Sequence, residues 1–469
     1  MSPIFDKLFN KNGPRPAPAQ AFDALFAQAM AAVAARNLER ALELYDQAIA
    51  ADPSRAEGHY KRANVLKDLG ELAAAMAAYD RAIALNPGYS QAYCNRGSVQ
   101  HNLGRTGDAL ASYDRAIEIA PSDAFAYYNR ALLLQELGRW DEALVSYDAA
   151  LAIDPAYADA HYNRALCLLF QGRFEPGWIA YEWRWKNAQR LGIGRHRTFK
   201  QPLWLGKESI ADRRLLLHSE AGLGDTVQFC RYATLCAARG ATVILEVPEP
   251  LLDLLAGLEG VSQIVAHGSP LPFFDFHCPL MSLPHALQTT VESIPAPHKY
   301  LHTDPQRVAQ WHRTLGGRTR PRIGLAWSGN PDNPIDRRRS IPLADWAAHL
   351  PPEFQYFCLQ TQVREADAEA LDASESIFRF ADDALDFAST AALCECMDLI
   401  VTIDTSIAHL AGALGRPTWV LLPEPPDWRW MRGRLDSPWY PTLKLYRQSS
   451  PGRWEDVLGQ VADDLRGAF

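Results

Sequence analysis

The sequence predicts an N-terminal all-α solenoid of helical hairpins, followed by an α/β region with two strand–helix units. A period of 34 residues in the first part of the chain predicts the solenoid. From Arg214 onward the period disappears, and short apolar runs alternate with amphipathic stretches, which predicts the α/β region. At 469 residues the chain is too long for one hydrophobic core, so we expect two or three domains.

The period appears in four columns of residues. One column is a tyrosine, at Tyr45, Tyr79, Tyr113, Tyr147 and Tyr181. The others are a small residue, a glycine and a proline, at Ala63, Gly97, Ala131 and Ala165; Gly70, Gly104, Gly138 and Gly172; and Pro53, Pro87, Pro121 and Pro155. The small residue lets two helices approach closely, the glycine ends the first helix of each pair, and the proline starts the next pair.

This pattern resembles the tetratricopeptide repeat (TPR), whose period is 34 residues. The resemblance implies a TPR solenoid of about five repeats over residues 21–188. Residues 1–20 are expected to be a flexible lead-in, and residues 189–213 a linker to the next domain.

Three asparagines repeat at the same step, at Asn95, Asn129 and Asn163. They fall in the first helix of each pair, the helix that lines the concave face of such solenoids. An asparagine ladder can hydrogen-bond the backbone of an extended peptide without reading its sequence, since each amide offers a donor and an acceptor. The alternative is that these asparagines hold neighbouring repeats together, and the sequence leaves both interpretations open.

The α/β region divides into two units with predicted parallel sheets, at residues 214–312 and 318–450, and a final helix at 451–469. In open parallel sheets, ligands bind beyond the carboxyl ends of the strands. The loops that follow the predicted strands are therefore the places to look for chemistry.

The first such loop contains Gly222, Gly224 and Asp225 and leads into a predicted helix over 226–238. It lacks the third glycine of the dinucleotide-binding fingerprint. The two glycines allow a ligand to approach the backbone. Asp225 is either a helix cap or a general base that faces the ligand, and the spacing alone permits both.

The second loop comes after 322–329, where a predicted strand runs into a loop, and it contains Asn330, then Arg337, Arg338 and Arg339. Three arginines beside a glycine-containing turn could clamp a diphosphate, although a solvated run of charge is the alternative.

The third loop follows a buried strand at Asp404, and Thr405 and Ser406 open the next helix, with His409 one turn further. Hydroxyl groups and backbone N–H groups at a helix N-terminus form an anion site.

Together these loops resemble the heptosyltransferase-like glycosyltransferases, and the whole chain resembles bacterial TPR glycosyltransferases with an architecture similar to that of the O-linked N-acetylglucosamine transferases. The resemblance implies the GT-B fold, with two Rossmann-like lobes: an acceptor lobe at 214–312 and a donor lobe at 318–450. It also implies that the final helix crosses back to the first lobe.

The same resemblance implies roles for individual residues. Asp225 matches the proposed catalytic base, and its neighbours His218 and Glu220 are the alternatives. The residues implied in donor binding are Asp404, Thr405, Ser406, His409, Asn330, Arg337, Arg338, Arg339 and Gln360. Gln360 would contact the nucleotide base, and the arginines stand near the position where the family has a lysine.

The resulting expectation is a glycosyltransferase that moves a sugar from a nucleotide-diphosphate donor to a protein acceptor held by the solenoid, with inversion. No Asp-x-Asp pair occurs in the chain, so we expect no metal, and no other cofactor. A carbohydrate- or lipid-linked acceptor, and a non-catalytic TPR scaffold with a glycosyltransferase-like fold, are the alternatives.

The composition of the chain excludes some classes of binding partner. The net charge of −8 argues against nucleic acid, whose phosphates require a basic face. The eight cysteines lack paired metal-ligand spacing, the first residues lack the long apolar run of a signal peptide, and no stretch reaches the roughly 18 apolar residues of a membrane span. These features predict a cytoplasmic protein with no membrane span.

Overall fold

The computed structural model describes residues 17–187, 199–333, 335–374, 376–380 and 386–469. The chain forms two compact units, Met1–Arg164 and Ala165–Phe469, which are treated separately below. Most of the expected lead-in, and residues 189–198 of the expected linker, lie outside the described residues. The first described helix already begins at Pro18.

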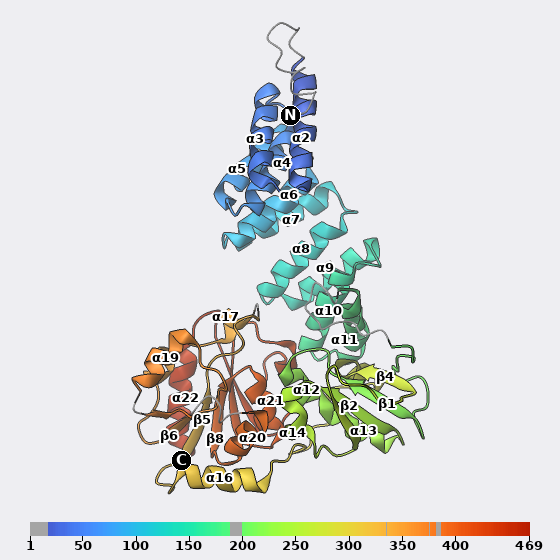
Figure 1. Cartoon of the computed structure of the whole chain (residues 1–469). Helices are drawn as coiled ribbons and strands as arrows, with labels where there is room; N and C mark the ends of the chain where they lie inside the picture. The colour runs from blue at the N-terminus through green and yellow to red at the C-terminus, as the bar shows by residue number, and fades with distance from the viewer. Residues whose placement is uncertain (1–16, 188–198, 334, 375, 381–385) are drawn as a thin grey trace. The chain divides into compact units, whose positions relative to one another are not determined.

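The first unit is a series of helical hairpins, coloured blue to teal in Figure 1. Its helices are α2 (Pro18–Ala34), α3 (Leu38–Ala51), α4 (Ala56–Asp68), α5 (Leu72–Leu85), α6 (Ser90–Asn102), α7 (Thr106–Ile119), α8 (Ala124–Glu136) and α9 (Trp140–Ile153), and α10 (Ala158–Phe170) runs across the boundary at residue 164. The predicted helical solenoid is confirmed.

The repeated residues have the roles that their spacing predicts. The tyrosines at 45, 79, 113 and 147 are buried in the hairpins. The glycines at 70, 104 and 138 have φ between 69° and 83°, the left-handed conformation that ends a helix. Gly97 lies against the ring of Tyr113, where an added Cβ would stand 2.8 Å from a ring carbon.

The second unit begins inside the last predicted repeat. The rest of α10, helix α11 (Phe174–Tyr181) and the short 3-10 helix η1 (Glu182–Asn187) belong to it. Trp178 donates its indole N–H to the carbonyl of Thr289 at 3.1 Å and packs edge-on against Trp428. The compact boundary at residue 164 therefore precedes the solenoid end that we expect from the period, at residue 188.

A four-stranded parallel sheet follows, in the order β3-β2-β1-β4. Its strands are β1 (Arg214–His218), β2 (Thr242–Val247), β3 (Val261–Ala266) and β4 (Phe276–Pro279). The helices between them are α12 (Leu223–Phe229), η2 (Cys230–Tyr232), α13 (Ala233–Ala238), η3 (Glu249–Leu251), α14 (Leu252–Leu255), η4 (Leu280–Ser282) and α15 (Leu283–Ala286). The single helix predicted over 226–238 is thus broken into three short segments.

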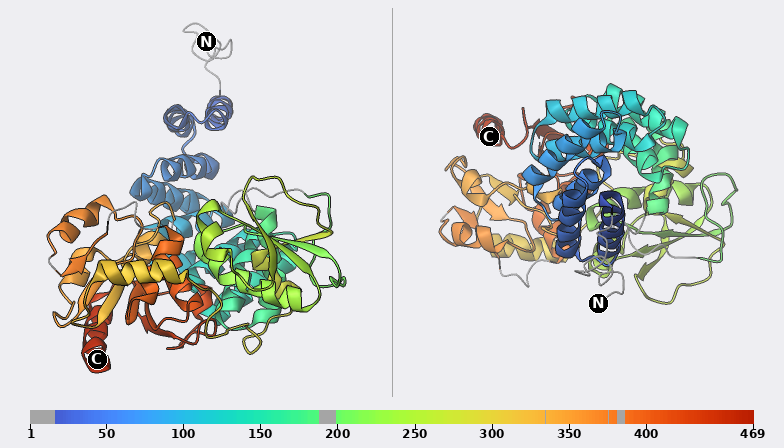
Figure 2. Two further views of the ribbon diagram at one scale, coloured as in Figure 1. Left: turned by 60° about the horizontal axis from the view of Figure 1, so that its bottom comes forward. Right: turned by 90° about the horizontal axis from the view of Figure 1, so that it is seen from above.

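A six-stranded parallel sheet follows α16 (Pro305–Leu315), in the order β10-β9-β8-β5-β6-β7. Its strands are β5 (Arg322–Ala326), β6 (Gln355–Cys358), β7 (Ile377–Phe378), β8 (Leu399–Ile403), β9 (Thr418–Leu422) and β10 (Leu443–Arg447). Its helices are α17 (Asp336–Arg339), α18 (Leu343–Ala347), α19 (Glu365–Asp372), α20 (Phe387–Glu395), α21 (Ser406–Ala413) and η6 (Trp428–Trp430), with α22 (Glu455–Ala468) at the end. The two sheets share no strand, and both are drawn in Figures 1 and 2.

The final helix corrects one expectation. The apolar face of α22, formed by Val457, Leu458, Val461 and Leu465, is buried in the same core as β5 and β8 of the six-stranded sheet. The helix therefore completes the second sheet's own core and does not cross back to the first lobe. Burying this apolar stripe on the nearest sheet satisfies it without a long crossover.

Two further properties concern the described residues. No helix among them combines the length and apolarity that a bilayer span requires. All eight cysteines are buried free thiols, so they serve the core as small apolar residues.

Candidate active site

The N-termini of α12 and α21 meet in the second unit, at the carboxyl ends of β1 and β8. Gly224, in the first turn of α12, lies directly against α21. A Cβ added there would stand 3.0 Å from Cδ2 of His409 and 3.3 Å from Cα of Ser406. The structure thus brings together the first and third predicted loops, and a glycine allows the close approach.

Asp225 is held by two contacts at this junction. Its Oδ2 accepts a hydrogen bond from the backbone N–H of Gly222 at 2.9 Å, which is a cap of helix α12. Its Oδ1 forms an ion pair with Arg429. The side chain keeps 25% of its surface exposed, so it can still be reached from solvent. Asp225 therefore caps helix α12, and whether it also acts as a base stays open.

Arg429 is a site residue that the sequence reasoning missed. Its Nε donates to Oε1 of Gln228 at 2.7 Å, and its Nη1 donates to Oδ1 of Asp427 at 2.9 Å. Its guanidinium carbon lies 4.4 Å from the centre of the Trp428 ring. Nothing in the sequence spacing places residue 429 beside residue 225, since the contact joins loops from different sheets.

Thr405 and Asp404 form the other side of the junction. Thr405 is the N-cap of α21, and its Oγ1 accepts from the N–H of Ile407 at 3.2 Å. The Asp404 carbonyl accepts from Nη1 of Arg339 at 2.7 Å. Burial and the neighbouring carboxylate of Asp427 raise the pKa of Asp404 to about 6. Ser406 is half-buried beside Gly224.

His409 is buried behind this turn. Its Nδ1 lies 3.0 Å from the hydroxyl of Tyr440, and its ring stacks on Trp430. Burial, together with the positive charge of Arg429, holds the pKa of His409 well below its ordinary value, so the ring is neutral. Gly412 lets Tyr440 reach it, because a Cβ at Gly412 would lie 2.4 Å from the tyrosine ring.

The three predicted arginines differ in their surroundings. Arg337 and Arg338 are exposed on α17, whereas Arg339 is half-buried and pairs with Asp336 at 3.3 Å. Asn330 is exposed, and its Oδ1 accepts from the N–H of Asp332 at 3.0 Å. The arrangement brings Arg339 to the Asp404 turn and leaves the contacts of the other two arginines with a ligand as a prediction.

Arg364 supports the second loop and was also missed. Its Nη2 donates to the Gly329 carbonyl at 2.9 Å and to the Ser340 hydroxyl at 3.0 Å, and it forms an ion pair with Asp336. It follows β6 in the chain, so its contact with the loop after β5 arises from strand order.

Gln360 uses its amide to hold the same loop. Oε1 accepts from the N–H groups of Trp327 at 2.7 Å and Ser328 at 2.9 Å. Nε2 donates to the Ser328 hydroxyl at 3.0 Å and the Gln362 carbonyl at 3.3 Å. A contact between Gln360 and a nucleotide base stays a prediction, and it requires some of these bonds to be exchanged.

The two alternative bases are buried beside β1. Nε2 of His218 lies 3.2 Å from Nδ1 of His277, which is on the neighbouring strand β4. Glu220 accepts through Oε1 from Arg184 at 3.0 Å and from the Met281 N–H at 3.2 Å. Among the described residues its Oε2 has no partner. Burial outweighs the attraction of Arg184 and raises the pKa of Glu220 from 4.5 to about 7.

This raised pKa predicts a pH-dependent stability that Glu220→Gln removes. Between pH 4.5 and about 7 the folded chain keeps a proton on Glu220 that the unfolded chain releases, so wild-type stability falls as pH rises through this window. As the pH rises through this window, the unfolding free energy of the glutamine variant should increase relative to that of wild type, by at most about 1.4 kcal/mol per pH unit.

Urea unfolding at several pH values, followed by tryptophan fluorescence, measures this difference. Every tryptophan except Trp140 lies in the second unit, so the signal reports that unit. Asp404 and His409 also titrate, but they are present in both proteins and cancel in the difference. A difference that stays flat from pH 4.5 to 7 would contradict the raised pKa of Glu220.

In the first unit, the amide nitrogens of the asparagine ladder contact the preceding repeat. Asn95 donates to the hydroxyl of Tyr60 at 3.1 Å, Asn163 donates to that of Tyr128 at 3.2 Å, and Asn129 lies 3.7 Å from the sulfur of Cys94. These contacts are those of the second interpretation, in which the ladder joins the repeats. Peptide binding by the same side chains stays a prediction.

Each ladder asparagine is followed by an arginine, and these arginines, together with Arg62 of the earlier repeat, form ion pairs between hairpins. Each pairs with an aspartate 16 residues earlier, at 2.5–2.9 Å: Arg62 with Asp46, Arg96 with Asp80, Arg130 with Asp114, and Arg164 with Asp148. The aspartates follow the repeated tyrosines, so this partner column was visible in the period.

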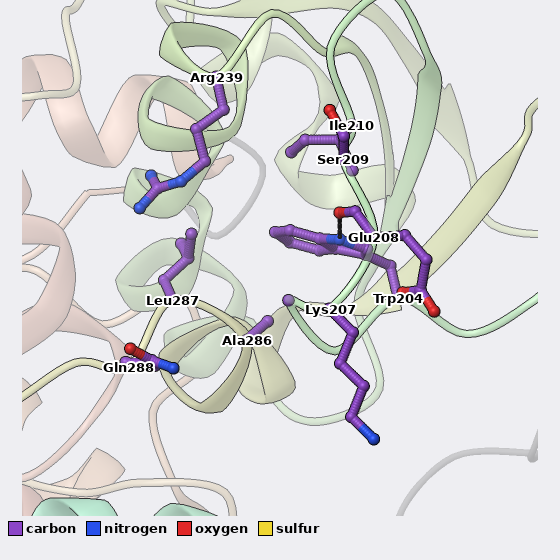
Figure 3. A pocket seen from close by; sticks show the side chains of 10 residues that line it. Trp204, Lys207, Glu208, Ser209, Ile210, Arg239, Ala286, Leu287 and Gln288 are labelled. Atoms are coloured by element: carbon purple, nitrogen blue, oxygen red, sulfur yellow. Dashed lines mark hydrogen bonds between the residues drawn. The ribbon is translucent and has the colours of Figure 1, made fainter.

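Two pockets lie away from the helix junction. One, of about 550 Å³, is lined by the side chains drawn in Figure 3, among them Trp204, Lys207, Arg239 and Gln288. The other, of about 250 Å³, includes Asp253, His302 and Arg307. None of the predicted site residues lines either pocket. Within the described parts of the chain, no group of three or more His, Cys, Asp or Glu side chains is arranged to hold a metal ion.

Family models match two parts of the chain. Tetratricopeptide-repeat models match residues 26–90, 60–124 and 112–145, and a model described as TPR repeat matches 133–172. A model described as glycosyltransferase family 9 (heptosyltransferase) matches 360–422, a stretch that includes Gln360 and the turn from Asp404 to His409. These matches support a TPR-linked, glycosyltransferase-like protein.

Protein FlbA of Caulobacter vibrioides is 27% identical to the chain over 289 residues, which cover 56% of this chain and 48% of that protein. The chain thus spans about half the length of this curated relative. Among solved structures, MamA is 20% identical with a TM-score of 0.32, covering 35% of this chain and 96% of its own. PilF of Pseudomonas aeruginosa is 19% identical with a TM-score of 0.35, covering 36% of this chain and 77% of its own. At these TM-scores neither structure carries an argument about function.

Proposed function

We propose that this chain is a glycosyltransferase that moves a sugar from a nucleotide-diphosphate donor to an acceptor, with inversion and without a metal. We infer that its two parallel sheets are the paired lobes of the GT-B fold. In this proposal the four-stranded sheet belongs to the acceptor side and the six-stranded sheet to the donor side.

The observation that carries the proposal is the meeting of the α12 and α21 N-termini at the strand ends. Backbone N–H groups there are positively polarised and favour a bound anion such as a diphosphate. Gly224 keeps the turn free of a side chain, and the hydroxyls of Thr405 and Ser406 lie at the start of α21. The family 9 match over 360–422 contains the same turn.

The roles follow from charge and position. The acceptor nucleophile attacks the anomeric carbon and passes its proton to Asp225, while the bond to the diphosphate breaks and the nucleotide leaves with both electrons. The α21 N-terminus and the arginines of α17 stabilise the charge that develops on the diphosphate. A single displacement of this kind inverts the anomeric centre.

A protein acceptor held by the TPR solenoid is our first choice, since TPR arrays bind peptides through the concave face. One observation favours a carbohydrate- or lipid-linked acceptor instead: the amides of Asn95 and Asn163 already donate to tyrosine hydroxyls of the preceding repeat. A non-catalytic scaffold is supported by the ion pair and cap that occupy Asp225.

Calorimetric titration of the full chain with a panel of nucleotide diphosphates and their sugars tests the proposal. We expect one nucleotide family to bind, with affinity unchanged by a chelator. Transfer of labelled sugar from that donor into protease-sensitive material would then support a protein acceptor, and transfer into solvent-extractable material a lipid-linked one. Folded protein that binds no nucleotide would favour the scaffold.

A further inference from the structure

Arg429 joins the two halves of the candidate active site. Its guanidinium holds Asp225 and Gln228 on α12, and Asp427 in its own loop after β9. The side chain is only 9% exposed and is covered by Trp428. Arg429 therefore connects the loop after β9 to helix α12, which follows β1.

The ion pair between Arg429 and Asp225 conflicts with the base role proposed for Asp225. The oxygen that pairs with Arg429 is engaged by the guanidinium, so it is not free to accept a proton from an acceptor. The other carboxylate oxygen already accepts from Gly222. For Asp225 to take a proton from an acceptor, the ion pair with Arg429 has to open.

A bound anion would give Arg429 a second partner in the same place. A guanidinium can bind two phosphate oxygens at once, so it competes well for a diphosphate. Arg429 pairs with Asp225, and the adjacent Gly224 lies directly against Ser406 and His409 of α21. The predicted diphosphate position therefore lies within its field.

Resting on the proposed function, we propose that Arg429 is a positioning residue that exchanges partners. It pairs with Asp225 in the ligand-free chain and with the diphosphate when a donor binds, which releases Asp225 to act as base. Donor binding then switches on the base, and the empty site holds it unreactive.

The test is calorimetric binding of inorganic pyrophosphate to the full chain at fixed ionic strength. The variants are Asp225→Asn, Arg429→Gln and the double variant, with Arg434→Gln as a matched control. Asparagine keeps an oxygen that can accept from Gly222, so the helix cap survives. Arg434 stands in the same segment and forms its ion pair with the exposed Asp436.

We expect Asp225→Asn to tighten pyrophosphate binding by about fivefold or more, because Arg429 loses its competing partner. Arg429→Gln should weaken binding by about tenfold, and the double variant should bind like Arg429→Gln alone. Arg434→Gln should bind like wild type.

Two results overturn the inference while the proposed function stands. One is wild-type binding that Asp225→Asn does not tighten. The other is tightening that persists without Arg429, which would show simple removal of a repelling charge. If wild type binds neither pyrophosphate nor any nucleotide diphosphate, the result contradicts both the partner exchange of Arg429 and the proposed donor site.

Discussion

Asp225→Asn is expected to lower kcat by about 10²–10⁴-fold, the usual contribution of a positioned general base. Asparagine has nearly the same shape and can still cap α12 through Gly222, but it cannot accept the acceptor's proton. KM for the donor should stay the same or fall, since the partner that competes for Arg429 is gone. Steady-state kinetics with the donor identified by titration measures both constants.

The same variant separates the two roles that the sequence leaves open. If Asp225 is a cap and nothing more, kcat and stability should both stay close to wild type. Asp427→Asn is the matched control, because it removes the other carboxylate on Arg429 and leaves Asp225 in place. Equal losses of kcat in the two variants would count against a base at Asp225, and a loss in Glu220→Gln alone would move the role to Glu220.

Arg184→Met is expected to destabilise the second unit by about 3–5 kcal/mol, as for other buried ion pairs that lose one partner. Arg184 is fully buried in η1 and bonds Glu182 at 2.7 Å, Glu220 at 3.0 Å and the Ser282 hydroxyl at 2.7 Å. Methionine fills much of the volume but leaves Glu220 buried with no cation. Urea unfolding followed by tryptophan fluorescence measures the loss.

Two comparisons make this result specific. Arg213→Met removes an exposed arginine that stands 4.0 Å from Asp275 in the same sheet unit, and it should change stability by less than about 0.5 kcal/mol. Above pH 7, where Glu220 is ionised in the folded chain, adding Glu220→Gln to Arg184→Met should recover part of the loss, since it removes the uncompensated charge. Equal stability of Arg184→Met and wild type would mean that the buried pair contributes nothing net.

Arg184 also shows why the domain boundary is difficult to read from the period. Tyr181 keeps the 34-residue step and opens the Tyr-Glu-Trp-Arg-Trp stretch at 181–185, yet the arginine of this stretch bonds the loop after β1 and the η4 turn. A period records which residues share a face of a helix, whereas it contains no information about what that face packs against. The last repeat therefore fits the pattern of the solenoid but belongs to the second compact unit.

The local parts of the candidate site were predictable from the sequence. Gly224, Asp225, Thr405 and Ser406 each follow a recognisable apolar strand and open a helix, and such strand ends gather on one edge of a parallel sheet. The contacts between the loops were not predictable. Arg429 reaches Asp225 across the chain from another sheet, and Gln360 is used to hold the Trp327 turn.

The sequence by itself determined the repeat hairpins, the two parallel-sheet units and the helix starts that carry the candidate site. These features depend on residues close together in the chain, through periodicity, glycine conformation and helix capping. Only the tertiary structure decided that α22 stays on its own sheet, that the ladder amides contact neighbouring repeats, and that Arg429 holds Asp225. These contacts join residues that are far apart in the chain, so no local pattern specifies them. They bury charges or apolar faces, and breaking a buried contact costs free energy.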